Sequence, residues 1–238
     1  MKRSYLFFAL IYLSSTFLNA QTLNIKPIQT ALETSKQLKE YFYGFSLYDL
    51  DSNRFLLGVN EDKHFAPASN TKVFTLITAL IALGDSIPGI HYIERGDSLI
   101  FWGTGDPTFL HNRLDTRKVF DFLKSNTKDL YFLTTTPTQE PFYRNGWSIE
   151  DYNEYYQPEI STFPIYGNVV TFRESANSLK TSPKVFQKNV SFKADTLSKF
   201  SLTRSFADNH FTYNQSNIPH NYINEKPFRY SNELVVKL

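Results

Sequence analysis

A serine and a lysine three residues apart open the most apolar stretch of the chain. The segment Pro67–Lys72 reads Pro-Ala-Ser-Asn-Thr-Lys and leads into an apolar run that ends at Gly84. This pattern predicts a helix from about Ser69 to Leu83, with so broad an apolar surface that we expect it to be buried on most sides. Because positions i and i+3 share one helix face, Ser69 Oγ and Lys72 Nζ are expected to meet.

A hydroxyl beside an amine can carry out nucleophilic catalysis. Serine is a weak nucleophile until a base takes its proton, and a neutral lysine can be that base. Lowering an amine pKa from about 10.4 to about 7 requires roughly 4.6 kcal/mol of differential interaction. The helix dipole, burial or a second cation would act in that direction. We therefore predict Ser69 as nucleophile and Lys72 as its base. The alternative is a serine helix cap beside a solvated lysine.

The same tetrapeptide occurs a second time, as Ser125-Asn126-Thr127-Lys128. This copy lies at the end of a helix expected over 115–125 and runs into a strand expected over 130–135. Serine and asparagine are common where helices stop. We therefore predict a structural role for Ser125 and a solvated charge for Lys128.

The elements expected around these segments indicate an α+β fold. The first half should contain a helix over 27–43 and a hairpin whose strands, 44–48 and 54–59, flank the turn residues Asp51-Ser52-Asn53. A strand is expected over 99–102. From about residue 168 the chain is mainly β, with strands expected over 169–172, 190–193, 200–203 and 211–213.

The first twenty residues are typical of a cleavable signal peptide. Met1-Lys2-Arg3 precedes an apolar run that is too short for a stable membrane span, and Ala20 suits signal peptidase. An uncleaved anchor is the alternative. Removal of residues 1–20 takes away Lys2 and Arg3 from the 25 basic residues and none of the 23 acidic ones, so the mature chain is neutral. This balance argues against nucleic acid as a partner.

Several other chemistries are excluded by residue type. The chain has no cysteine, which excludes a disulfide framework, a thiol nucleophile, a thiolate metal site and a lipoprotein anchor. Its five histidines are scattered and form no helical pair, so no metal site is expected. His64 is interpreted as a loop residue, Asp106 as a turn residue before Pro107, and Trp102 and Trp147 as packing residues.

Three more blocks make the resemblance to a known family specific. They are Gly103-Thr104-Gly105-Asp106-Pro107, the segment Gly146–Tyr152 and the segment Ser161–Asn168. With the hairpin and the Ser-x-x-Lys helix, residues 28–238 resemble the penicillin-binding serine DD-peptidases. Within that group the chain is most similar to the type-4 low-molecular-mass D-alanyl-D-alanine carboxypeptidase/endopeptidase family.

The resemblance implies both an organisation and a function. Residues 1–20 would be the signal peptide, 21–90 the N-terminal part of a DD-peptidase catalytic domain, 91–225 an inserted accessory region, and 226–238 the start of the return to the catalytic domain. The protein would be periplasmic and would cleave peptidoglycan stem peptides through an acyl-enzyme on Ser69. It would bind β-lactams as inhibitors and need neither metal nor cofactor.

The chain also departs from the family pattern. The family carries Ser-x-Asn and Lys-Thr-Gly motifs after the insertion, on opposite walls of the cleft. Here Ser175-Ala176-Asn177 and the near match Lys180-Thr181-Ser182 lie only a few residues apart, so we interpret both as loop. The resemblance is therefore to an N-terminal fragment, from which little or no activity is expected.

Two other functions remain open at this point. Tyr166-Gly167-Asn168 matches the Tyr-x-Asn motif of class C β-lactamases and related esterases, although a turn before a strand is the favoured interpretation. A non-catalytic cell-wall scaffold that kept the fold is the third possibility.

Overall fold

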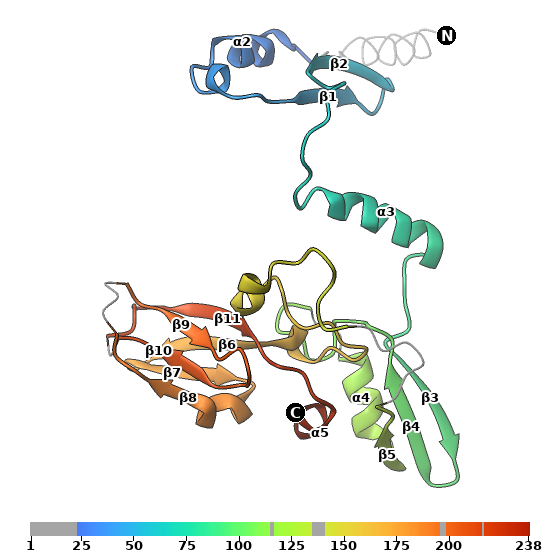
Figure 1. Cartoon of the computed structure of the whole chain (residues 1–238). Helices are drawn as coiled ribbons and strands as arrows, with labels where there is room; N and C mark the ends of the chain where they lie inside the picture. Colours follow the sequence, from blue (N-terminus) through green and yellow to red (C-terminus); the bar gives the residue numbers. More distant parts are fainter. Residues whose placement is uncertain (1–22, 115–116, 135–140, 196–198, 216) are drawn as a thin grey trace, which may run out of the picture. The chain divides into compact units, whose positions relative to one another are not determined.

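The computed structural model describes residues 23–114, 117–134, 141–195, 199–215 and 217–238. The chain divides into two compact units, the first ending at Thr78 and the second beginning at Ala79 (Figure 1). The signal peptide predicted for residues 1–20 lies outside the described residues.

The first unit contains the predicted hairpin. Strands β1 (Phe45–Asp49) and β2 (Arg54–Val59) pair in antiparallel register, from Phe45 opposite Val59 to Asp49 opposite Arg54. Asn53 closes the turn in the left-handed region, with a φ of 55°. Asparagine tolerates this conformation better than most residues, so the turn residues of the sequence do form the turn.

The helix predicted over 27–43 is shorter than expected. Helix α2 spans Lys26–Thr34 and is followed by a short 3-10 helix, η2 (Leu38–Glu40). Thr34 Oγ1 donates to the carbonyl of Thr30 at 2.7 Å, and Ser35 Oγ accepts from the amide of Leu38 at 3.2 Å. Adjacent hydroxyl side chains thus offer the backbone partners other than the helical ones, which ends the helix at Thr34.

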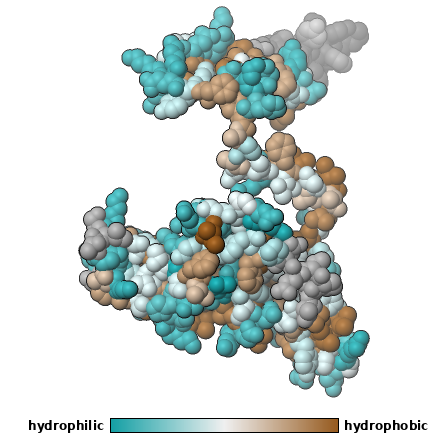
Figure 2. Space-filling view, in the orientation of Figure 1, coloured by the Kyte–Doolittle hydropathy of each residue, from teal (hydrophilic) through white to brown (hydrophobic). Residues whose placement is uncertain are grey.

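Helix α3 (Thr71–Leu83) runs from the first unit into the second and confirms the predicted apolar helix. Gly84, with a φ of 79°, ends it. The predicted burial is wrong, because the large apolar side chains of α3 are between 49 and 81% exposed (Figure 2). Apolar periodicity specifies the helix here, but burial also requires a partner surface. No helix in the described ranges is both long and apolar enough to cross a membrane.

The second unit begins with a three-stranded sheet. Strand β4 (Ser98–Gly103) lies between β3 (Ile90–Arg95), which is antiparallel to it, and β5 (Asp129–Phe132), which is parallel to it. Helix α4 (Lys118–Ser125) lies between β4 and β5 in the chain, as a parallel pair requires. Strand β3 was not predicted, because five of its six side chains are exposed and its pattern lacks a buried face.

Two further sheets complete the second unit. One has the order β11-β6-β7, formed by β6 (Val169–Ser175), β7 (Ser178–Ser182) and β11 (Ile223–Pro227). The other has the order β8-β10-β9, formed by β8 (Val190–Phe192), β9 (Leu202–Arg204) and β10 (Phe211–Tyr213). The 3-10 helices η3 (Ile149–Asn153), η4 (Tyr166–Asn168) and η5 (Lys184–Asn189) and the terminal helix α5 (Asn232–Lys237) connect or follow these strands. The predicted α+β class is confirmed.

Aromatic side chains dominate the core of the second unit. Phe163, Phe172, Phe186, Phe211 and Phe228 are at most 3% exposed. Several of these rings touch one another, as Phe172 and Phe211 do with centroids 5.0 Å apart. Because a chain without cysteine has no disulfide to hold it, burial of this aromatic surface supplies much of its stability.

Asn168 joins three segments from a buried position. Its Nδ2 donates to the Glu159 carbonyl and to Ser161 Oγ, each at 2.9 Å, and its Oδ1 accepts from the amide of Ile165 at 3.1 Å. The Asn168 carbonyl accepts from the amide of Phe228 at 3.0 Å. Asn168 is 2% exposed, so the Glu159 carbonyl, the Ser161 hydroxyl and the Ile165 amide would each lose a partner if the side-chain amide were removed.

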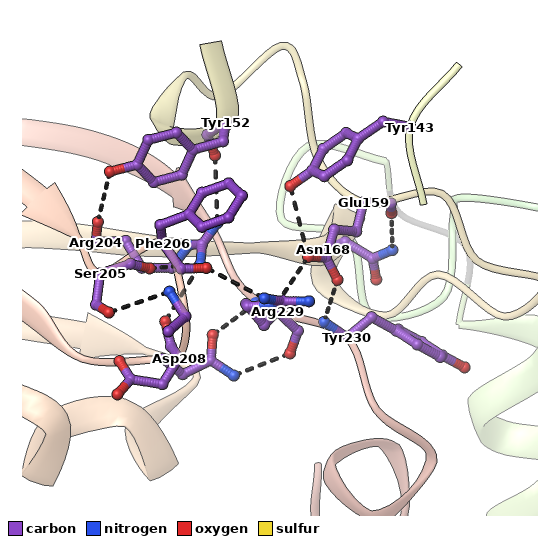
Figure 3. Close-up of polar contacts among 12 residues, drawn as sticks. Tyr143, Tyr152, Glu159, Asn168, Arg204, Ser205, Phe206, Asp208, Arg229 and Tyr230 are labelled. Atoms are coloured by element: carbon purple, nitrogen blue, oxygen red, sulfur yellow. Dashed lines mark hydrogen bonds and ion pairs between the residues drawn. The ribbon is translucent and has the colours of Figure 1, made fainter. Parts of the chain in front are cut away.

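Glu159 and Arg204 lie in a buried polar cluster beside Asn168 (Figure 3). Arg229 Nε contacts Glu159 Oε1 at 3.1 Å, and the amide of Tyr230 donates to Glu159 Oε2 at 2.8 Å. Arg204 Nη1 donates to the carbonyl of Ser205 at 2.7 Å. Arg204 Nη2 also donates to the carbonyl of Tyr152 at 3.5 Å, so the cluster connects the loop before β6, strand β9 and the segment after β11.

We expect Asn168→Ala to lower the free energy of unfolding by about 3 kcal/mol, since it removes three buried hydrogen bonds. Urea denaturation of the full chain measures the change. The exposed Asn145→Ala serves as the matched control and should stay within about 0.5 kcal/mol of the unchanged chain. Equal effects of the two changes would contradict the anchoring role.

A second prediction concerns alkaline pH. Burial raises the pKa of Tyr230 to about 12. Between about pH 10 and 12 the unfolded chain therefore loses a proton that the folded chain keeps, so the stability present below pH 10 declines by at most about 1.4 kcal/mol per pH unit for this group. Tyr230→Phe should make the decline in unfolding free energy shallower over this window, measured by denaturant titrations at several pH values. An unchanged slope would contradict the prediction.

Candidate active site

Ser69 lies in a tight turn immediately before helix α3. The amide of Lys72 donates to the Ser69 carbonyl at 3.1 Å, and the amide of Thr71 to the Ala68 carbonyl at 3.2 Å. Side chains fix the same turn, because Asn70 Oδ1 accepts from the amide of Ala68 at 2.8 Å and Thr71 Oγ1 donates to its carbonyl at 2.9 Å. The helix starts two residues later than predicted, and Ser69 faces its first turn.

The contact predicted from the spacing is present. Lys72 Nζ donates to Ser69 Oγ at 3.0 Å. Both residues are exposed, so the neighbouring side chains do not exclude water from the pair. The structure therefore provides a hydroxyl and an amine in contact at a helix N-terminus, the arrangement that a lysine-assisted serine nucleophile requires. His64, expected in a loop, lies in the exposed segment between β2 and α3.

The second Ser-x-x-Lys segment is structural. Ser125 is the last residue of α4, and its hydroxyl donates to the Phe122 carbonyl at 3.2 Å. Lys128 is not the solvated charge that was predicted, because its Nζ lies 2.9 Å from Glu94 Oε2 and donates to the Gly96 carbonyl at 2.9 Å. The identical tetrapeptides thus have different roles that depend on where their helices begin and end.

Tyr166 and Asn168 form the short helix η4 before β6, as the turn interpretation predicts. Tyr166 packs against the core of the second unit, and burial raises the pKa of its hydroxyl. Asn168 is occupied by the backbone contacts described above. This Tyr-x-Asn segment therefore has a complete structural explanation.

The two segments whose sequences match or nearly match the Ser-x-Asn and Lys-Thr-Gly motifs lie on one hairpin. Ser175-Ala176-Asn177 forms the turn between β6 and β7, where Ala176 and Asn177 have φ values of 50° and 55°. Asn177 Oδ1 accepts from the amide of Ile218 at 3.1 Å. The prediction of a loop is confirmed for Ala176 and Asn177. It is wrong for Lys180–Ser182, because this segment lies in β7 and pairs with Thr171–Arg173.

Two of the family-like blocks pack directly on each other. A Cβ placed on Gly103 would lie 2.1 Å from the Thr162 carbonyl oxygen, and the amide of Gly105 donates to that oxygen at 2.6 Å. Asp106 shapes the following turn as predicted, since its carboxylate accepts from the amide and the hydroxyl of Thr108. The glycines of the Gly-x-Gly-Asp-Pro block therefore allow the backbone at Thr162 to approach closely, which a side chain at Gly103 would prevent.

The two tryptophans differ from each other. Trp102 is half-buried and lies against His91, with ring centroids 5.8 Å apart, which agrees with the predicted packing role. Trp147 is 41% exposed, and its ring centroid lies 6.4 Å from that of Tyr143, so it packs only in part. The neighbouring pair Tyr155-Tyr156 was the sequence signal that could have drawn attention to this surface.

Comparisons with known proteins agree with the predicted resemblance. A profile of the D-Ala-D-Ala carboxypeptidase 3 (S13) family matches residues 25–210. No curated protein matches the chain.

Solved structures give the same fold. A crystal structure of penicillin binding protein 4 (dacB) from Haemophilus influenzae is similar with a TM-score of 0.57 and 16% identity, over 91% of this chain and 52% of that one. A second structure of that protein, complexed with a novel β-lactam, gives a TM-score of 0.51 and 15% identity over 91% and 50%. The chain therefore spans about half the length of these proteins.

The predicted type-4 resemblance is thus confirmed by a family match over most of the chain and by the fold. The chain belongs to the D-Ala-D-Ala carboxypeptidase 3 (S13) family of peptidases.

Proposed function

We propose that this chain supplies the nucleophile and the base of a periplasmic serine-type D-alanyl-D-alanine carboxypeptidase/endopeptidase that acts on peptidoglycan stem peptides. The observation that carries the proposal is the 3.0 Å contact from Lys72 Nζ to Ser69 Oγ in a chain of the S13 family. The pair uses the first turn of a helix, where backbone amides can also stabilise an oxyanion.

The proposed reaction proceeds in two steps. Ser69 Oγ bonds to the carbonyl carbon of the penultimate D-alanine while its proton passes to Lys72, and the bond from that carbon to the nitrogen of the leaving residue breaks. The leaving amine takes up a proton. Water then attacks the ester, which releases the shortened peptide and returns the proton to Ser69 Oγ. A β-lactam carbonyl would acylate the same oxygen.

The exposure of the pair defines what else the reaction needs. A base of this kind works as a neutral amine, which a water-excluding and cationic environment favours. We propose that the enzyme places the Ser-x-Asn and Lys-Thr-Gly groups of its family around Ser69 and Lys72. The 238 residues described by this sequence should then show little activity by themselves.

A non-catalytic cell-wall scaffold and an enzyme that uses Tyr166 are the two alternatives. The exposed pair is the observation that favours the scaffold, since the contact alone does not make an enzyme. The hydrogen bonds of Asn168 argue against the Tyr166 alternative. They occupy the side chain of the asparagine in the Tyr-x-Asn segment, which is then not available to a substrate.

Labelled penicillin tests the nucleophile in the full-length protein. Ser69→Ala should abolish covalent labelling, and Lys72→Ala should slow acylation by about 10³-fold, because each change removes one half of the pair. The matched controls are Ser125→Ala and Lys128→Ala in the identical tetrapeptide, which should label normally. Label retained by Ser69→Ala would refute the assignment, and absence of label from the unchanged protein would support the scaffold.

The Tyr166 alternative has its own test. Tyr166→Phe keeps the ring in the core and removes the hydroxyl, so the acylation rate should stay within about twofold of the unchanged protein. A tyrosine that moves a proton in the reaction would instead cost about 10²-fold or more. The rate of penicillin labelling under single-turnover conditions separates these outcomes.

A further inference from the structure

An exposed aromatic surface lies on the loop that precedes β6, within the second unit. It consists of four large side chains of this loop and one from the segment after β9: Trp147, Ile149, Tyr155, Tyr156 and Phe206. These side chains are 41, 64, 57, 59 and 50% exposed. Figure 2 shows brown and tan atoms among teal and white ones where this loop lies. The Tyr155 and Tyr156 rings lie edge-on with centroids 5.5 Å apart, and exposed apolar side chains gathered on one loop indicate an interaction site.

The loop that carries these side chains is held firmly. Gln157 is 6% exposed, and its Nε2 donates to the Ser148 carbonyl at 2.7 Å. Trp147 and Tyr156 precede these two residues, so this bond brings their positions together. The amide of Ile160 donates to the Phe142 carbonyl at 2.9 Å and closes the base of the loop.

The opposite side of the loop is anchored to the sheets. Tyr152 Oη donates to the Arg204 carbonyl at 3.1 Å, and Asn153 Oδ1 accepts from the Arg204 amide at 2.8 Å (Figure 3). Phe206 lies edge-on to the Tyr152 ring, with centroids 5.1 Å apart. The outward side chains are therefore presented by a fixed backbone, which lowers the entropy cost of binding a ligand.

Two arginines, Arg144 and Arg229, flank the loop, and Arg229 Nη1 donates to the Phe206 carbonyl at 3.2 Å, but most of the charges beside the aromatic side chains are acidic. Glu150, Asp151 and Glu154 lie among them, and Asp151 and Glu154 help to raise the pKa of the Tyr156 hydroxyl, after burial as the first cause. Carboxylates accept hydrogen bonds from hydroxyl and amide groups and repel other carboxylates. The surface thus offers carboxylate acceptors to a ligand rich in hydroxyl groups.

We propose that this aromatic surface binds the glycan strand of peptidoglycan, an inference that rests on the proposed function. The apolar faces of pyranose rings stack on tryptophan and tyrosine, and the sugar hydroxyl and N-acetyl groups donate to Glu150 and Asp151. A cationic ligand would require an enclosed aromatic cage to gain much from its charge, whereas these rings are open to solvent along the loop. An open surface of this kind suits an extended polymer.

The binding experiment uses the full chain and insoluble strands of chitin, the N-acetylglucosamine polymer, which present sugar hydroxyl and N-acetyl groups without stem peptides or carboxylates. Retention on these strands should fall about tenfold in Trp147→Ala and in Tyr155→Ala. The matched control is Tyr131→Ala, which removes a side chain 53% exposed on β5, outside the surface, and should leave retention unchanged. Circular dichroism checks that each variant is folded.

A spectroscopic measurement reports on the site itself. The chain has two tryptophans, so Trp102→Phe leaves Trp147 as the only one. Its emission should change saturably as the N-acetylglucosamine tetramer is added. Retention only on free stem peptides or on polylysine, a loss of self-association in Trp147→Ala without glycan binding, or an unchanged emission would each overturn the proposal.

The same experiment separates this inference from the proposed function. Ser69→Ala should bind the glycan strands as well as the unchanged chain. In the unchanged full-length protein, absence of penicillin labelling with glycan binding intact would contradict only the peptidase, and labelling without glycan binding would contradict only the role of the aromatic surface.

Discussion

A buried carboxylate sets the arrangement of the second unit. Glu159 is 2% exposed and must have partners, because an unpaired charge in the interior costs several kcal/mol. Arg229 and the amide of Tyr230 supply these partners from the segment after β11. Asn168, the next anchor along the chain, binds the carbonyl of the same glutamate. The loop that ends at Glu159, the start of β6 and the chain after β11 are therefore fixed as one group.

The candidate catalytic pair depends on a much simpler constraint. Ser69 and Lys72 meet because three residues make nearly one helical turn, and the turn before α3 is fixed by its own side chains. Nothing distant in the sequence is required for this contact. Exclusion of water from this pair has a different requirement, because it depends on other parts of the protein covering the start of α3.

The family-like blocks of the second unit serve packing. Gly103 allows the Thr162 carbonyl to approach β4, and Asn168 satisfies backbone groups that would otherwise lie buried without partners. These are structural reasons for residue types that mark the family. Packing accounts for only part of the aromatic surface around Trp147, because its side chains remain 41 to 64% exposed, and this exposure is the reason for proposing a ligand there.

The sequence by itself determined the local features: the hairpin, the apolar helix, the turn at Asp106 and the contact between Ser69 and Lys72, all of which depend on residues close together in the chain. Tertiary structure decided the rest. Only the fold paired Lys128 with Glu94, placed Lys180–Ser182 in a strand and left α3 exposed. Periodicity reports which face of an element is apolar, but burial, ion pairing and exposure depend on segments that lie far apart in the sequence.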